Sequence, residues 1–156
     1  LAVGMALSAR HRGDAHRVFT LLGDGETGEG SVWEAVMAAR SNRLGNLVAF
    51  VDRNRQLMTS FAEERVAFEP YPDKWRAFGW NVVHIDGHDM AQLVEALDAL
   101  PEPDTETPTV IIAETIKGKG VDFMEHNLAW HAGSLGAADL ERALAALTAS
   151  REKESV

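Results

Sequence analysis

The apolar residues of this chain gather in short runs that alternate with segments of helical spacing. Four of the runs have the length of a strand and are nearly continuous, which is typical of strands covered on both faces. We predict strands over residues 17–22, 46–52, 80–85 and 109–115.

Between these runs, apolar residues recur every three or four positions, which is the period of a helix packed along one side. Ser31 and Glu34 have the spacing of a capping box, so we expect a helix to start there and to end before Gly45. His88 and Asp89 precede another helical segment and are expected to cap it. The remaining helices are predicted over residues 1–11, 72–78, 90–100 and 137–149, with long loops over 53–70 and 117–134.

Strands that alternate with helices predict an α/β fold, with a parallel sheet and helices on both of its faces. We expect one domain over residues 1–150 and a flexible tail over 151–156. The first ten residues begin without a start methionine, and we expect residues that belong before them to be absent from this chain. Ligands of such sheets bind beyond the carboxyl ends of the strands.

Composition restricts the chemistry. The net charge of -9 argues against nucleic acid or an anionic membrane as a partner. The absence of cysteine excludes disulfides, thiolate catalysis and cysteine-ligated metal sites. No apolar run is long enough to cross a membrane, and we expect a cytoplasmic protein.

The loop after the first strand combines glycines with acids. Its sequence, GDGETGEG, has the G-x-G-x-x-G outline of a dinucleotide-binding turn but carries Asp24, Glu26 and Glu29. Asp52, 24 residues after Gly28, could then bind a ribose. However, a carboxylate beside a pyrophosphate is repelled, by about 1 kcal/mol in water at 4 Å and about 4 kcal/mol at an effective dielectric near 20.

A magnesium ion would remove this repulsion. Mg²⁺ is commonly held by one or two carboxylates together with substrate phosphates. Asp24 could bind one side of the ion, and Asn54, just after the second strand, could add an amide oxygen. The loop therefore indicates a metal-assisted diphosphate site.

At this point the residues resemble a known family. GDGETGEGSVWEA followed by NLVAFVDRN is similar to the thiamine diphosphate motif, and Asn54 follows Asp24 at a spacing of 30 residues. KWRAFGWNVVHIDGHD, TVIIAETIKGKGVDF and the AWHAGSLG region also resemble transketolases, especially bacterial ones that are split into two chains. The resemblance covers essentially the whole chain and implies a thiamine diphosphate-binding fold.

The resemblance implies a metal and diphosphate site. In transketolases the Asp of GDG, the later Asn and a backbone carbonyl two residues after it bind the divalent metal. These positions are Asp24, Asn54 and Gln56 here, and Gly23 and Gly25 would lie against the diphosphate.

Three further residues acquire roles from the same resemblance. Glu29 matches a glutamate at the subunit interface near the cofactor, and Met58 falls where an apolar residue packs beneath the cofactor rings. His131 is implied as a catalytic residue near the diphosphate or substrate. The chain departs from the family at Asn127, where many transketolases have a second histidine.

The implied activity is transfer of a two-carbon ketol unit between sugar phosphates, with thiamine diphosphate and Mg²⁺ as cofactors. The chain would supply only the diphosphate half of the site. A second subunit would carry the pyrimidine-binding domain, and the assembly would contain two copies of each chain. The chain would also self-associate.

Other hypotheses remain open. The first is a nicotinamide oxidoreductase built on the glycine turn. Deoxyxylulose phosphate synthase shares the KGKG feature, and pyruvate dehydrogenase alpha subunits have a related motif. The last is a truncated homologue that keeps the fold without catalysing.

Overall fold

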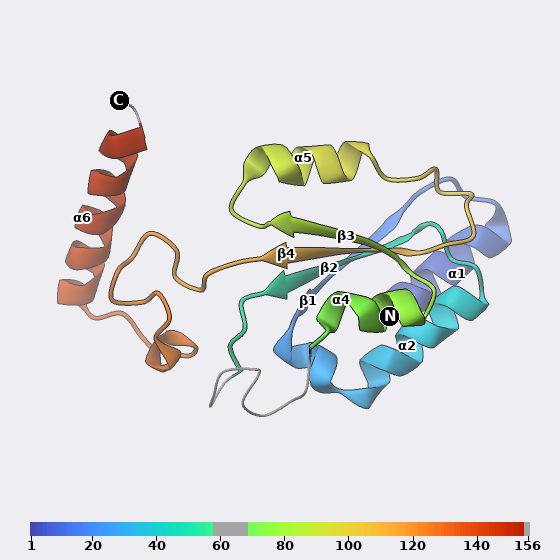
Figure 1. Cartoon of the computed structure of the whole chain (residues 1–156), viewed down its shortest axis with the longest axis horizontal. Coiled ribbons are helices and arrows are strands. Elements are labelled where there is room, and N and C mark those ends of the chain that lie inside the picture. Colours follow the sequence, from blue (N-terminus) through green and yellow to red (C-terminus); the bar gives the residue numbers. More distant parts are fainter. Residues whose placement is uncertain (58–68, 155–156) are drawn as a thin grey trace.

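Four parallel strands form one sheet in the order β1-β2-β4-β3 (Figure 1). The computed structural model describes residues 1–57 and 69–154, with side chains up to residue 149. The strands are β1 (Val18–Gly23), β2 (Leu47–Arg53), β3 (Asn81–Asp86) and β4 (Thr109–Glu114). All three neighbouring pairs are parallel, so the predicted parallel sheet is confirmed.

Helices lie on both faces of the sheet, as predicted. In Figure 1, α5 lies along one face and α1, α2 and α4 along the other, while α6 stands away from the sheet. The helices are α1 (Ala2–Arg12), α2 (Gly30–Ser41), α4 (Tyr71–Ala77), α5 (Met90–Asp98) and α6 (Ala137–Glu154). Two short 3-10 turns, η1 (Gly25–Gly28) and η2 (Leu128–Trp130), lie in the loops. None of the helices in the described ranges has the length and apolar character needed to span a membrane.

Strand alternation divides the core into two layers. Val51 and Ile112 face the layer that contains Trp75 of α4, whereas Ile111 packs with Ala96 of α5 on the other face. Because successive side chains of a strand point to opposite faces, a continuous apolar run fills both layers.

The α5 face is not covered over its whole width. Phe19 and Leu21 of edge strand β1 point to this face and keep 53% and 73% of their surface exposed. Their strand neighbours Val48 and Phe50 belong to the layer under α5. The expectation that both faces are covered therefore holds for the inner strands better than for β1.

The predicted capping box at the start of α2 is wrong. The helix begins at Gly30, with Glu29 at its N-cap and no capping side chain. The preceding residues form η1, which is fixed instead by Thr27, whose hydroxyl donates to the Asp24 carbonyl at 2.6 Å. The expected cap of α5 is confirmed for Asp89, which accepts from two backbone N–H groups.

The carboxyl ends of the strands meet at one edge of the sheet, shown by the arrowheads in Figure 1. The glycine loop leaves β1 there, and residues 54–57 leave β2 beside it. The long segment between β4 and α6 starts from the same edge. This edge therefore brings together the glycine loop, residues 54–57 and the start of the segment after β4, where ligands of parallel sheets bind.

Candidate functional site

Asp24 fastens the glycine loop to the neighbouring strand end. Its backbone N–H donates to the Asp52 carbonyl at 3.1 Å, which continues the pairing of β1 with β2. Its carboxylate oxygen Oδ1 accepts from the Gly25 N–H at 2.8 Å, and Oδ2 accepts from the Arg55 N–H at 2.7 Å. The side chain is almost fully buried. Asp24 is therefore held beside the residues that follow β2.

Asn54 and Gln56 lie within this junction. The Asn54 side-chain oxygen accepts from the Gln56 N–H at 3.0 Å, which tightens the turn after β2. Gly25 faces the same turn, since a Cβ on it would lie 3.8 Å from the Gln56 carbonyl oxygen and 2.5 Å from Leu57 Cδ2. The structure thus brings the predicted metal ligands Asp24, Asn54 and Gln56 together.

A buried arginine shares the Asp24 carboxylate. Arg53 Nη1 lies 2.8 Å from Asp24 Oδ2, and both side chains are only 1% exposed. Arg53 Nη2 lies 2.7 Å from a carboxylate oxygen of Glu69, and the guanidinium carbon lies 4.7 Å above the Tyr71 ring centroid. Burial raises the pKa of Asp24 above its ordinary value, while the hydrogen bonds from Arg53 and Arg55 oppose that rise.

The donor set fits a hard divalent cation. It offers one carboxylate, one amide oxygen and one backbone carbonyl, which are the oxygen ligands that Mg²⁺ accepts together with phosphates. The side-chain oxygen of Gln56 is buried without a hydrogen-bond partner, so a further oxygen is available at this junction. No group of three His, Cys, Asp or Glu side chains suited to a metal occurs in residues 1–57 and 69–154. Water or a bound phosphate would supply the remaining ligands of a metal held here.

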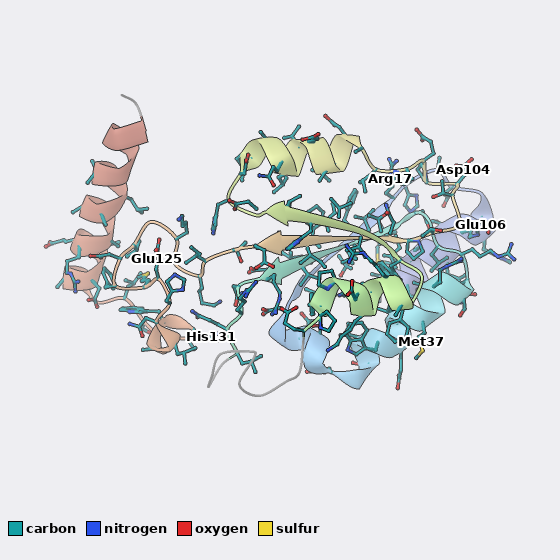
Figure 2. All side chains as sticks on the ribbon, in the orientation of Figure 1. Arg17, Met37, Asp104, Glu106, Glu125 and His131 are labelled. Carbon is teal, nitrogen blue, oxygen red and sulfur yellow. The ribbon has the colours of Figure 1, made fainter. Side chains whose placement is uncertain are left out.

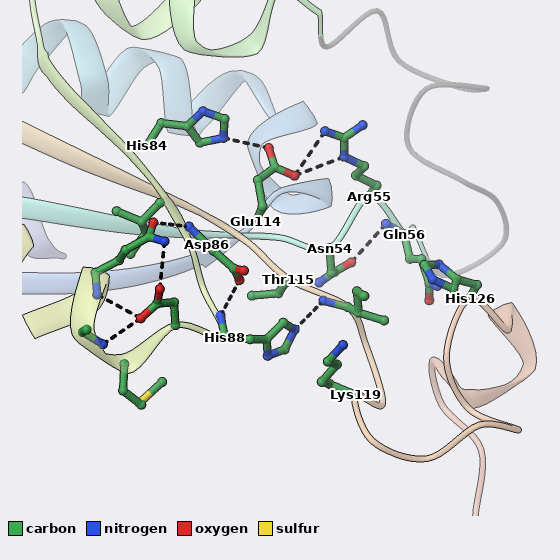
Figure 3. A pocket seen from close by; sticks show the side chains of 16 residues that line it. Asn54, Arg55, Gln56, His84, Asp86, His88, Glu114, Thr115, Lys119 and His126 are labelled. Carbon is green, nitrogen blue, oxygen red and sulfur yellow. Dashed lines mark hydrogen bonds and ion pairs between the residues drawn. The ribbon is translucent and has the colours of Figure 1, made fainter. Parts of the chain in front are cut away.

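A large open pocket extends from Asn54 toward β3 and β4 (Figure 3). Its volume is about 1220 Å³, and it is lined by residues from the ends of three strands and from the segment after β4. Figure 3 shows Asn54 and Gln56 on one side of this pocket, with His88 and Lys119 across from them. Asn54 and Gln56 therefore border a space large enough for a bound molecule, whereas Asp24 does not line it.

Several residues of this pocket have no role predicted from the sequence. His84 Nε2 lies 2.9 Å from one carboxylate oxygen of Glu114, and Arg55 Nη2 lies 3.1 Å from the other. His88 does not cap α5 but accepts from the Ile116 N–H at 2.8 Å, which ties the end of β3 to the end of β4. These contacts join residues that are 28 to 59 positions apart, so no local pattern could have indicated them.

The other predicted site residues are spread more widely. His131 ends η2 on the segment between β4 and α6 (Figure 2), and its Nδ1 is buried without a partner. No hydrogen bond in the described residues joins His131 to Asp24 or Asn54. Glu29 lies exposed between η1 and α2. Met58 lies outside the described residues.

Comparison with known proteins decides the family. The family described as "Transketolase, thiamine diphosphate binding domain" matches residues 8–154. The chain belongs to the transketolase family. This match sets aside the nicotinamide oxidoreductase hypothesis.

The similar proteins agree with this assignment. Over 130 residues the chain is 43% identical to the 6-deoxy-6-sulfo-D-fructose transketolase subunit of Clostridium sp. (strain MSTE9), covering 83% of this chain and 47% of that protein. Over 153 residues it is 37% identical to an apulose-4-phosphate transketolase subunit from Phocaeicola vulgatus, covering 98% and 54%. The chain thus spans about half the length of the curated relatives it matches.

The fold of this transketolase domain has a close counterpart in a solved structure. The transketolase from Campylobacter jejuni superposes with a TM-score of 0.86 at 27% sequence identity, covering 94% of this chain and 24% of that one. The predicted fold class is therefore confirmed.

Proposed function

We propose that this chain is the diphosphate-binding subunit of a split transketolase that transfers a two-carbon ketol unit between sugar phosphates. The observation that carries the proposal is the junction at the ends of β1 and β2. There a buried Asp24 carboxylate is bonded to the backbone beside Asn54, in a chain that belongs to the transketolase family.

In this proposal, side-chain oxygens of Asp24 and Asn54 and the carbonyl of Gln56 bind Mg²⁺. Gly23 and Gly25 lie against the diphosphate in this proposal, because neither has a side chain that would occupy the space of the phosphates. Thiamine diphosphate, when bound, supplies the carbanion chemistry of the reaction. The chain holds and orients its diphosphate end.

The remaining predicted residues act around this anchor. His131 is proposed to lie near the diphosphate or the substrate, where its unpartnered Nδ1 can accept or donate a hydrogen bond. Met58 is proposed to pack beneath the cofactor rings. Glu29, exposed at the start of α2, is proposed to contact a neighbouring subunit.

The proposed partner is a second subunit that carries the pyrimidine-binding domain, with two copies of each chain in a cytoplasmic assembly. The matched relatives named as subunits support this arrangement. Their names specify a sulfosugar and apulose 4-phosphate, which are both sugar derivatives with an acidic group. We therefore propose sugar phosphates or similarly charged sugars as substrates of this chain's assembly.

Cofactor binding tests the metal site. We expect thiamine diphosphate to bind the assembled enzyme in a Mg²⁺-dependent manner. Asp24→Ala should abolish that dependence and Asn54→Ala should weaken it. Glu34→Ala, an exposed acid of α2, should retain it. Unchanged Mg²⁺-dependent binding in both Asp24→Ala and Asn54→Ala would contradict the assignment.

An assay of ketol transfer tests whether the chain needs a partner subunit. We expect no ketol transfer from the chain alone, because a cofactor open to water on one side is neither shielded nor activated. Transfer should appear on mixing with the partner subunit. Full activity of the lone chain would refute the proposed division, and cofactor binding without activity in the mixture would favour a non-catalytic homologue.

A further inference from the structure

The site contains a cation that belongs to the protein itself. Arg53 is the last residue of β2, and its side chain points to the same face as Val51, toward α2 and α4. It meets Asp24 there with an N–O distance of 2.8 Å, and the two side chains are almost completely removed from solvent. Its neighbour Asp52 faces the other way and accepts a hydrogen bond from the Thr115 hydroxyl.

The Asp24 carboxylate has few free hydrogen-bond acceptor positions after these contacts. Oδ2 accepts from both Arg53 Nη1 and the Arg55 N–H, which uses its two lone-pair positions. Within residues 1–57 and 69–149, Oδ1 accepts only from the Gly25 N–H, which leaves one acceptor position on it. A divalent cation bound there would share one carboxylate with the guanidinium.

We propose that Arg53 is a built-in counter-ion of the cofactor site, a positioning residue that acts through Asp24. It holds the Asp24 carboxylate, and with it the glycine loop, in place before any metal binds. It also weakens the attraction between Asp24 and a divalent cation, because two cations that share a carboxylate repel each other. This inference rests on the proposed function, in which Asp24 is a metal ligand.

Arg53 should raise the stability of the chain without metal but lower its affinity for the metal. A residue with a merely structural role would not have both effects. Removing one member of a buried ion pair leaves an uncompensated charge and destabilises the fold. The same removal leaves a metal as the cationic partner of Asp24. The chain without Arg53 should therefore be less stable without metal but should bind the metal more tightly.

The test uses the purified full chain and Mn²⁺ as the probe, with free Mn²⁺ measured by electron paramagnetic resonance and stability measured by thermal melting. Arg53→Gln keeps a hydrogen-bond donor and removes the charge. We expect it to melt at a lower temperature than the wild type without metal, yet to bind Mn²⁺ about tenfold more tightly, which corresponds to about 1.4 kcal/mol. Arg53→Lys, which restores the charge, should return the Mn²⁺ affinity toward the wild-type value.

Arg55 provides a matched control two residues along the chain. Its side chain is 54% exposed and pairs with Glu114 rather than with Asp24. Arg55→Gln removes the same charge and should leave the Mn²⁺ affinity nearly unchanged, because solvent screens an exposed charge.

Several results would overturn the inference. An unchanged or weaker Mn²⁺ affinity in Arg53→Gln would show that the arginine does not compete with the cation. An equal gain in Arg55→Gln would show a general effect of charge. Absence of Mn²⁺ binding in the wild type and in every variant would remove the metal site itself, and with it both this inference and the metal part of the proposed function.

Discussion

Gly23 separates what the fold requires from what the cofactor requires. It is the last residue of β1, its φ lies outside the left-handed region, and a Cβ built on it meets no atom within 4 Å. Nothing in the described chain therefore demands glycine at this position. In the proposed site, however, the backbone of Gly23 lies against the diphosphate.

The substitution Gly23→Ala should leave the stability of the fold intact but weaken cofactor binding. We expect the free energy of unfolding to stay the same or to rise by up to about 1 kcal/mol, because alanine reduces the entropy of the unfolded chain. Binding of thiamine diphosphate should weaken, because a methyl group forced into a filled contact costs about 1–3 kcal/mol. That cost corresponds to a dissociation constant about 5- to 150-fold higher.

Two measurements check this prediction: urea unfolding of the chain and Mg²⁺-dependent titration of thiamine diphosphate into the assembled enzyme. Gly30→Ala is the control, since its Cβ also meets nothing within 4 Å and it lies at the start of α2. It should keep both stability and binding. If Gly23→Ala binds the cofactor as tightly as the wild type does, the diphosphate does not lie against Gly23. If it unfolds more readily, the space around the end of β1 is tighter than the structure indicates.

Two further predictions concern the fold. Gly45→Ala should destabilise the chain by about 1–3 kcal/mol in urea unfolding, because the new Cβ would lie 2.0 Å from the rigid Thr105 carbonyl oxygen. Gly4→Ala in α1, where a Cβ meets nothing, should instead stabilise it, and a loss at both positions would contradict the packing argument. The backbone hydrogen bond from Gln92 is the main reason that the pKa of Asp89 is lowered below its ordinary value of 3.8, so its contribution to stability is present above that pH and is lost as pH falls through the folded-state value. The difference in melting temperature between wild type and Asp89→Asn should therefore shrink below pH 3.8, and a constant difference would refute this.

The sequence predicts the elements of this fold better than their contacts. The parallel sheet follows from apolar runs that alternate with helical spacing. The proposed ligands Asp24 and Asn54 follow from an acid in a glycine loop and an amide after the second strand, whereas Gln56 follows only from the resemblance to transketolases. The capping box failed because Ser31 and Glu34 have the right spacing but the chain uses a 3-10 turn anchored by Thr27 before the helix starts. Spacing alone does not show whether a competing local hydrogen bond is available.

The contact of Arg53 with Asp24 was not predicted from the sequence, for a different reason. Its partner Asp24 is 29 residues away, and only the pairing of β1 with β2 brings them together. The sequence shows the repulsion between acids and phosphates, and a metal is the cation that it suggests for relieving that repulsion. The structure shows that Arg53 is a further cation beside Asp24. No pattern in the sequence indicates on which face of the sheet its side chain lies.

The register of β1 against β2 decides which charge Asp24 meets. Gly23 pairs with Asp52, so Asp24 lies beyond the last pair and faces the side where Val51 and Arg53 point. A shift of β2 by one residue would turn every side chain to the opposite face. It would turn Val51, which is fully buried now, toward the α5 face and would place the carboxylate of Asp52 next to that of Asp24. Two carboxylates would then meet in a buried position, where their repulsion is strong. The charge balance of the proposed metal site therefore favours the observed register.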